Sequence, residues 1–144
     1  LQNQDAFRYA VDQFAEFYKD KKLDAIVAIE ARGFFFGSPL AYRLQTPLIP
    51  IRKSQKLPRD TISSNYSLEY GSSGIEMHQD SLNNMQRVLI IDDLLATGGT
   101  VSAAIGLVEK LGASVTSLAF LVELMSFNAR SRLNKYHMIS LVKY

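Results

Sequence analysis

Acidic, small and hydroxyl residues are concentrated in one stretch, Val88-Leu-Ile-Ile-Asp-Asp-Leu-Leu-Ala-Thr-Gly-Gly-Thr100. An apolar run ends there in two carboxylates, passes through small residues and enters a helical pattern. The first N–H groups of a helix lack intrahelical partners and carry partial positive charge, and glycines let a ligand approach the backbone. We therefore expect a binding site for a phosphate monoester, formed by Ala96, Thr97, Gly98, Gly99 and Thr100.

The two carboxylates, Asp92 and Asp93, follow the predicted strand at its carboxyl end, where α/β proteins bind ligands. Because carboxylates repel a phosphate, we expect them to bind another part of the ligand. A sugar diol fits, since its hydroxyls donate hydrogen bonds that strengthen as positive charge develops at the anomeric carbon. No lysine follows the glycines, so the stretch is not a Walker A loop. The alternative is a solvated acidic turn followed by an ordinary glycine-containing loop.

The elements that must position these residues follow from hydrophobic periodicity. It predicts helices over residues 5–21, 34–44, 100–111 and 128–134, and strands over residues 24–30, 47–51, 67–70, 74–78, 87–93, 115–123 and 138–142. Prolines in 47–51 favour an edge or irregular position. Residues 53–65 are predicted to form a long loop, and residues 71–74 a hairpin turn. Strands alternating with helices predict an α/β fold with a largely parallel twisted sheet flanked by helices, and the loop and hairpin form a flexible lid.

Composition narrows the class of protein. The 144 residues suit one domain, residues 1–144, and 47% hydrophobic residues argue against disorder. A net charge of +2 argues against general nucleic-acid binding, and no apolar run approaches the roughly 20 residues of a membrane helix. With no cysteine, a reducing, cytoplasmic setting is expected. His78 and His137 have no partners at metal-ligand spacing, so no protein metal cage is predicted.

Residues 90–100 resemble the phosphoribosyl-pyrophosphate signature of type I phosphoribosyltransferases, in the version found in the adenine-specific members. Further segments resemble those enzymes in the same order: Glu30-Ala-Arg-Gly-Phe-Phe-Phe-Gly37, Ile51-Arg-Lys-Ser-Gln-Lys-Leu-Pro58, Tyr66-Ser-Leu-Glu-Tyr-Gly71 and Val122-Glu-Leu124. The resemblance implies the type I phosphoribosyltransferase fold and transfer of a phosphoribosyl group from phosphoribosyl pyrophosphate to adenine, giving AMP and pyrophosphate. It also implies a homodimer and a Mg²⁺ ion bound mainly through the pyrophosphate and ribose of the substrate.

The resemblance assigns roles to residues outside the signature. It implies that Arg32 binds pyrophosphate at a turn with a cis peptide between Glu30 and Ala31. The alternative for Arg32 is a surface arginine that caps a loop. Four cations lie within residues 52–59, and family analogy assigns charge neutralisation of the leaving group to three of them, with a solvated basic loop as the alternative. These three are Arg52, Lys53 and Lys56.

The remaining assignments concern the purine. Glu69 and Tyr70 are expected to close over the substrate and exclude water, and Glu69 to assist movement of the purine proton. One exposed Glu in an alternating strand is the ordinary alternative. Leu124 is expected either in the wall of the purine pocket or in the core.

The family carries adenine contacts on a segment ahead of the first helix, and no counterpart is expected in this sequence. Two other functions stay open at this point. One is a non-catalytic regulator of the same fold that senses phosphoribosyl pyrophosphate, and the other is the same transfer to hypoxanthine, guanine or xanthine.

Overall fold

A computed structural model describes residues 1–68 and 71–144, so the predicted site residues Glu69 and Tyr70 lie outside the described residues. The elements, in chain order, are α1 (Gln4–Tyr18), β1 (Ala25–Ile29), α2 (Gly33–Leu44), β2 (Leu48–Lys53), β3 (Thr61–Leu68), β4 (Gly71–His78), β5 (Arg87–Leu95), α3 (Gly99–Lys110), β6 (Ser114–Glu123), the 3₁₀ turn η1 (Met125–Phe127), α4 (Ala129–Arg132) and β7 (His137–Lys143).

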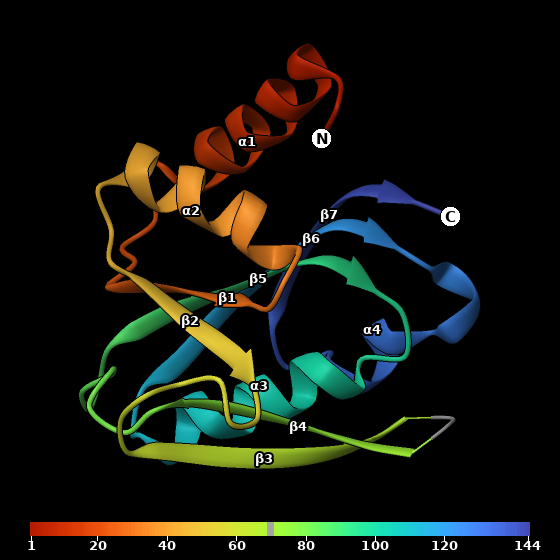
Figure 1. The fold of residues 1–144 in the computed structure, drawn as a ribbon. Helices are drawn as coiled ribbons and strands as arrows, with labels where there is room; N and C mark the ends of the chain where they lie inside the picture. Colours follow the sequence, from red (N-terminus) through yellow and green to blue (C-terminus); the bar gives the residue numbers. More distant parts are fainter. Residues whose placement is uncertain (69–70) are drawn as a thin grey trace.

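The strands form one seven-stranded sheet in the order β3-β4-β2-β1-β5-β6-β7. The ladders from β2 through β1, β5 and β6 to β7 are parallel, whereas β4 pairs antiparallel with both β2 and β3. The predicted α/β fold with a largely parallel sheet is confirmed. Figure 1 shows α1 and α2 over one face of the sheet and α3 over the other.

Alternating residues of the central strands fill two separate cores. In β1, Val27 and Ile29 belong to the core under α3, whereas Ile26 and Ala28 belong to the core under α1 and α2. All of β1 is buried, because a central parallel strand is covered on both faces. On the second face, Gly37 of α2 sits so close to the sheet that an added Cβ would lie 2.6 Å from the Cβ of Ala28.

Two expectations about the middle of the chain are wrong. Strand β2 is internal rather than at an edge, although it contains Pro50. Pro50 pairs with Ala28 of β1. Strand β4 pairs with β2 only at Arg52 and Lys53, so no hydrogen bond to β4 is lost because proline has no N–H.

The predicted long loop 53–65 is the second error, because its last third belongs to β3. β3 pairs with β4 from Thr61–His78 to Leu68–Gly71, so residues 71–74 are strand and not a hairpin turn. Serine, threonine and asparagine dominate the start of β3, so the segment lacks the apolar alternation that marks a strand. The predicted helix over 128–134 is also shorter, since α4 covers only residues 129–132 and η1 precedes it.

Candidate active site

A cavity of about 840 Å³ opens at the carboxyl ends of β1 and β5. It is lined by residues 30–32, Lys53, residues 92–101, Phe127 and Arg132. The described part of the chain has another hollow of about 610 Å³ beside α2, whose one charged lining residue, Arg43, pairs with Asp12. Only the first cavity contains acidic residues and the predicted anion-binding turn.

The turn between β5 and α3 presents backbone donors to this cavity. Gly98 adopts φ 82°, a left-handed conformation that side chains disfavour, and this brings the chain into the first turn of α3. The N–H groups of Ala96, Thr97, Gly98 and Thr100 donate to none of the described residues. Gly99 N lies 3.4 Å from Thr97 Oγ1, a long contact. The amides that the sequence predicts for an anion therefore remain available.

Asp92 and Asp93 line the same cavity but have different hydrogen-bond partners. Asp93 accepts a hydrogen bond from the Arg32 side chain, and its own N–H donates to Asp92 Oδ1 at 2.8 Å. Burial raises the pKa of Asp92 to about 8, with the neighbouring Asp93 charge acting in the same direction. Burial therefore favours the neutral form of Asp92, whereas Arg32 lies against Asp93.

The turn after β1 is held from the side by β2. The peptide between Glu30 and Ala31 is cis, as the family resemblance implies. The Glu30 carboxylate accepts from Arg52 Nε and Nη2, both at 3.1 Å, and from Lys53 N at 2.8 Å. The Arg52 hydrogen bonds lower the pKa of Glu30, so this carboxylate stays ionised.

The three cations that were predicted to bind the leaving group differ in whether they line the cavity. Lys53 lines the cavity, whereas Arg52 is occupied by Glu30 and does not. Lys56 also lies outside the lining, and its backbone N–H donates to Glu76 at 2.8 Å.

Glu76 alternates with Ile75 and Met77 along β4, which predicts an exposed carboxylate, yet only 6% of the residue surface is accessible. The turn 54–57 covers this face and donates to Glu76, a contact that strand alternation could not reveal.

The end of the sheet adds residues that the sequence left unassigned. Leu124 is half-buried, donates its N–H to Leu95 O at 2.8 Å and does not line the cavity. Phe127 and Arg132, three and eight residues further on, do line it. Phe127 is 41% exposed, and no periodicity distinguishes it from an ordinary surface aromatic.

Within residues 1–68 and 71–144, no group of three or more His, Cys, Asp or Glu side chains could hold a metal ion. None of the helices in that same part of the chain is long and apolar enough to cross a membrane.

Fold and cavity together define a largely parallel α/β protein whose cavity lies between a glycine turn and paired acids. The family model for the phosphoribosyl transferase domain matches residues 1–143. The chain belongs to this family, and its fold is the type I phosphoribosyltransferase fold.

Individual relatives narrow the comparison. The adenine phosphoribosyltransferase of Clostridium tetani is 52% identical over 144 residues, which are 100% of this chain and 84% of that protein. A crystal structure of adenine phosphoribosyltransferase from Thermoanaerobacter pseudethanolicus matches with a TM-score of 0.95 and 48% identity, over 99% of this chain and 83% of the other. The Saccharomyces cerevisiae enzyme, complexed with an imino-altritol bisphosphate and adenine, matches with a TM-score of 0.89 and 36% identity, over 97% and 81%.

Proposed function

We propose that this chain is an adenine phosphoribosyltransferase of purine salvage. It transfers the 5-phosphoribosyl group of phosphoribosyl pyrophosphate to adenine and forms AMP and pyrophosphate. Its 52% identity to an enzyme of that name, over the whole chain, supports this substrate choice. The observation that carries the proposal is structural: four unpartnered amides and two acids meet in one cavity of about 840 Å³.

The turn from Ala96 to Thr100 binds the 5′-phosphate. Its amides supply hydrogen bonds without any rearrangement of the protein, and α3 adds the partial positive charge of its first turn. The hydroxyls of Thr97 and Thr100 are further donors at the same place. The phosphate therefore fixes the sugar in one orientation in the cavity.

Asp92 and Asp93 bind the ribose hydroxyls. The bond from the anomeric carbon to pyrophosphate breaks as the bond to adenine nitrogen forms, and the sugar becomes cationic in between. Carboxyl oxygens that accept hydrogen bonds from the sugar hydroxyls stabilise that charge, and their fixed positions spare the reaction the cost of reorientation. The purine loses a proton in this step, and the expected acceptor, Glu69, lies outside the described residues.

Arg32 and Lys53 bind the departing pyrophosphate. Both line the cavity next to the Glu30–Ala31 turn, and Arg32 already lies against Asp93. A guanidinium that is held by a carboxylate is oriented before the phosphates arrive, and its remaining N–H groups stay available. Lys53 adds a second charge from the end of β2.

Mg²⁺ fits this cavity as an ion that enters with the sugar donor. The ion would be held mainly by the pyrophosphate and ribose oxygens of the substrate and by water, next to the carboxyl groups of Asp92 and Asp93. When bound, the ion neutralises charge on the pyrophosphate. We further propose a cytoplasmic homodimer, for which the absence of cysteine and the family resemblance are the support.

The direct test is incubation of the protein with phosphoribosyl pyrophosphate, Mg²⁺ and each of adenine, hypoxanthine, guanine and xanthine, with chromatography of the nucleotides. AMP alone is expected. The variant carrying both Asp92→Asn and Asp93→Asn should form it at least about a hundredfold more slowly. Another nucleotide in place of AMP would move the assignment to another purine, and no nucleotide from any base would favour the sensing regulator.

A further inference from the structure

Arg132 is a cation at the phosphate end of the cavity that the sequence did not single out. Its side chain extends from the last residue of α4, lines the cavity and donates a hydrogen bond through Nη2 to the backbone carbonyl of Thr97. Thr97 belongs to the glycine turn whose amides are unpartnered. The guanidinium is therefore fixed beside those amides.

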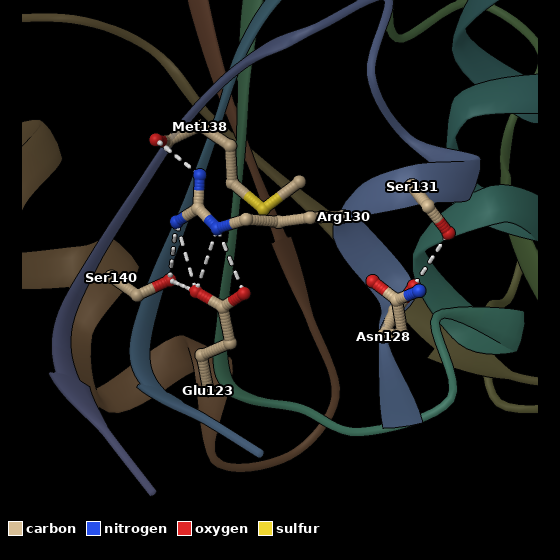
Figure 2. Close-up of polar contacts among 6 residues, drawn as sticks. All are labelled: Glu123, Asn128, Arg130, Ser131, Met138 and Ser140. Atoms are coloured by element: carbon tan, nitrogen blue, oxygen red, sulfur yellow. Dashed lines mark hydrogen bonds and ion pairs between the residues drawn. The ribbon is translucent and has the colours of Figure 1, made fainter. Parts of the chain in front are cut away.

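A buried ion pair holds the segment that carries Arg132. The Glu123 carboxylate accepts from Arg130 Nε at 2.8 and 3.1 Å and from Arg130 Nη2 at 2.8 Å, and Ser140 Oγ donates to it at 2.7 Å (Figure 2). Glu123 is only 3% exposed, and although burial opposes its ionisation, the Arg130 and Ser140 hydrogen bonds lower its pKa. The pair therefore ties α4 to the end of β6 and to the middle of β7.

Apolar contacts fix the same segment on both sides of Arg132. Ala129 and Leu133 are each 3% exposed and belong to the core under α3. Arg132 lies between them in sequence and is itself exposed, so its backbone is held while its side chain faces the cavity.

The cations that line the cavity thus lie in two different places. Arg32 lies against Asp93, on the side of the cavity formed by the turn after β1, and Lys53 comes from the end of β2. Arg132 lies against the glycine turn instead. A guanidinium has five N–H donors in a planar fork that matches a phosphate, and the Thr97 carbonyl uses one of them.

We propose that Arg132 binds the phosphate monoester held by the Ala96–Thr100 turn, as a side-chain ligand in addition to the backbone amides. This inference rests on the proposed function for the identity of the phosphate, which is the 5′-phosphate of the sugar donor and of AMP. Arg132 thereby contributes to the preference for a phosphorylated over an unphosphorylated sugar.

The test compares ligands that carry this phosphate with one that lacks it. Calorimetry gives the dissociation constants of AMP, adenosine and ribose 5-phosphate for the unmodified protein, Arg132→Ala, Arg132→Lys and Lys135→Ala. Lys135 is an exposed cation three residues further on that lies outside the cavity lining, so its variant controls for the change in net charge.

Arg132→Ala should weaken AMP and ribose 5-phosphate by about tenfold to a hundredfold, the range for a hydrogen bond to a charged group, and leave adenosine unchanged. Arg132→Lys should fall between, since it keeps the charge without the fork. Lys135→Ala should bind all three ligands normally.

Equal weakening of AMP and adenosine, or no weakening of AMP, would overturn the role of Arg132. Absence of ribose 5-phosphate and AMP binding to the unmodified protein would overturn both proposals. If ribose 5-phosphate binds and depends on Arg132 while no base yields a nucleotide, only the proposed activity fails.

Discussion

Asp92 is the residue whose ionisation the fold opposes most clearly among the acids of the cavity. Burial raises its pKa to about 8, and Arg32 pairs with Asp93 rather than with Asp92. A protonated carboxyl can donate a hydrogen bond to a sugar hydroxyl as well as accept one. Asp92 could therefore donate to the proposed ribose as well as accept from it.

This raised pKa predicts a pH-dependent stability. Between about pH 4 and pH 8 the native state holds a proton that the unfolded chain has released, so the free energy of unfolding falls as pH rises. Each pH unit in this window is worth up to about 1.4 kcal/mol. The Asp92→Asn variant lacks this contribution. Its unfolding free energy, minus that of the unmodified protein, should therefore increase by a few kcal/mol from pH 5 to pH 8.

Urea unfolding of both proteins at pH 5 and pH 8 measures this effect, because other titrating groups cancel in the difference. A difference in unfolding free energy that is the same at the two pH values would show that Asp92 ionises normally.

Residues of the site were predictable from sequence where they are contiguous. Asp92, Asp93 and the glycine turn follow one another along a strand, a turn and a helix, so local patterns suffice to bring them together. Arg132 donates to Thr97 across 35 residues, and only the packing of α4 creates that contact. Arg52, which family analogy assigns to the leaving group, pairs with Glu30 and lies outside the cavity lining, a placement that its charge alone does not reveal.

At the scale of elements, prediction succeeded for strands buried on both faces. The apolar runs of β1 and β5 are long enough to mark their position, and both are central in the sheet. Prediction failed for β3, which is an edge strand with a polar sequence. It also failed for the position of β2 in the sheet, where Pro50 is tolerated because β4 pairs only with Arg52 and Lys53, after the proline.

The close packing of α2 on β1 gives a prediction with a matched control. Gly37→Ala would place a Cβ 2.6 Å from Ala28 Cβ and 3.1 Å from Ile91 Cγ2, so it should destabilise the protein by about 1–3 kcal/mol. Gly106→Ala, in the exposed part of α3, meets nothing within 4 Å and should stabilise the protein by roughly 0.5–1 kcal/mol.

Chemical denaturation of the two variants at one pH measures these opposite signs. Equal or greater stability of Gly37→Ala would mean that α2 does not lie as close to the sheet as described.

At the scale of the whole molecule, the parallel sheet creates the site. Because β1, β2 and β5 run in one direction, their carboxyl ends bring the cis-peptide turn, Lys53 and the acid pair to one edge (Figure 1). Two cores, one on each face, fix the strands from which these turns extend. The topology could be predicted as a class from alternating elements, whereas the cavity depends on side-chain contacts between distant segments.

The central claim is that the turn between β5 and α3 binds the phosphate of a pentose whose hydroxyls form hydrogen bonds with Asp92 and Asp93. A crystal structure of the protein with ribose 5-phosphate measures this directly. We expect phosphate oxygens within hydrogen-bond distance of the amides of residues 96–100, and ribose hydroxyls against the two carboxyl groups. A sugar phosphate bound elsewhere, or a turn whose amides are bonded to the protein itself, would contradict the account.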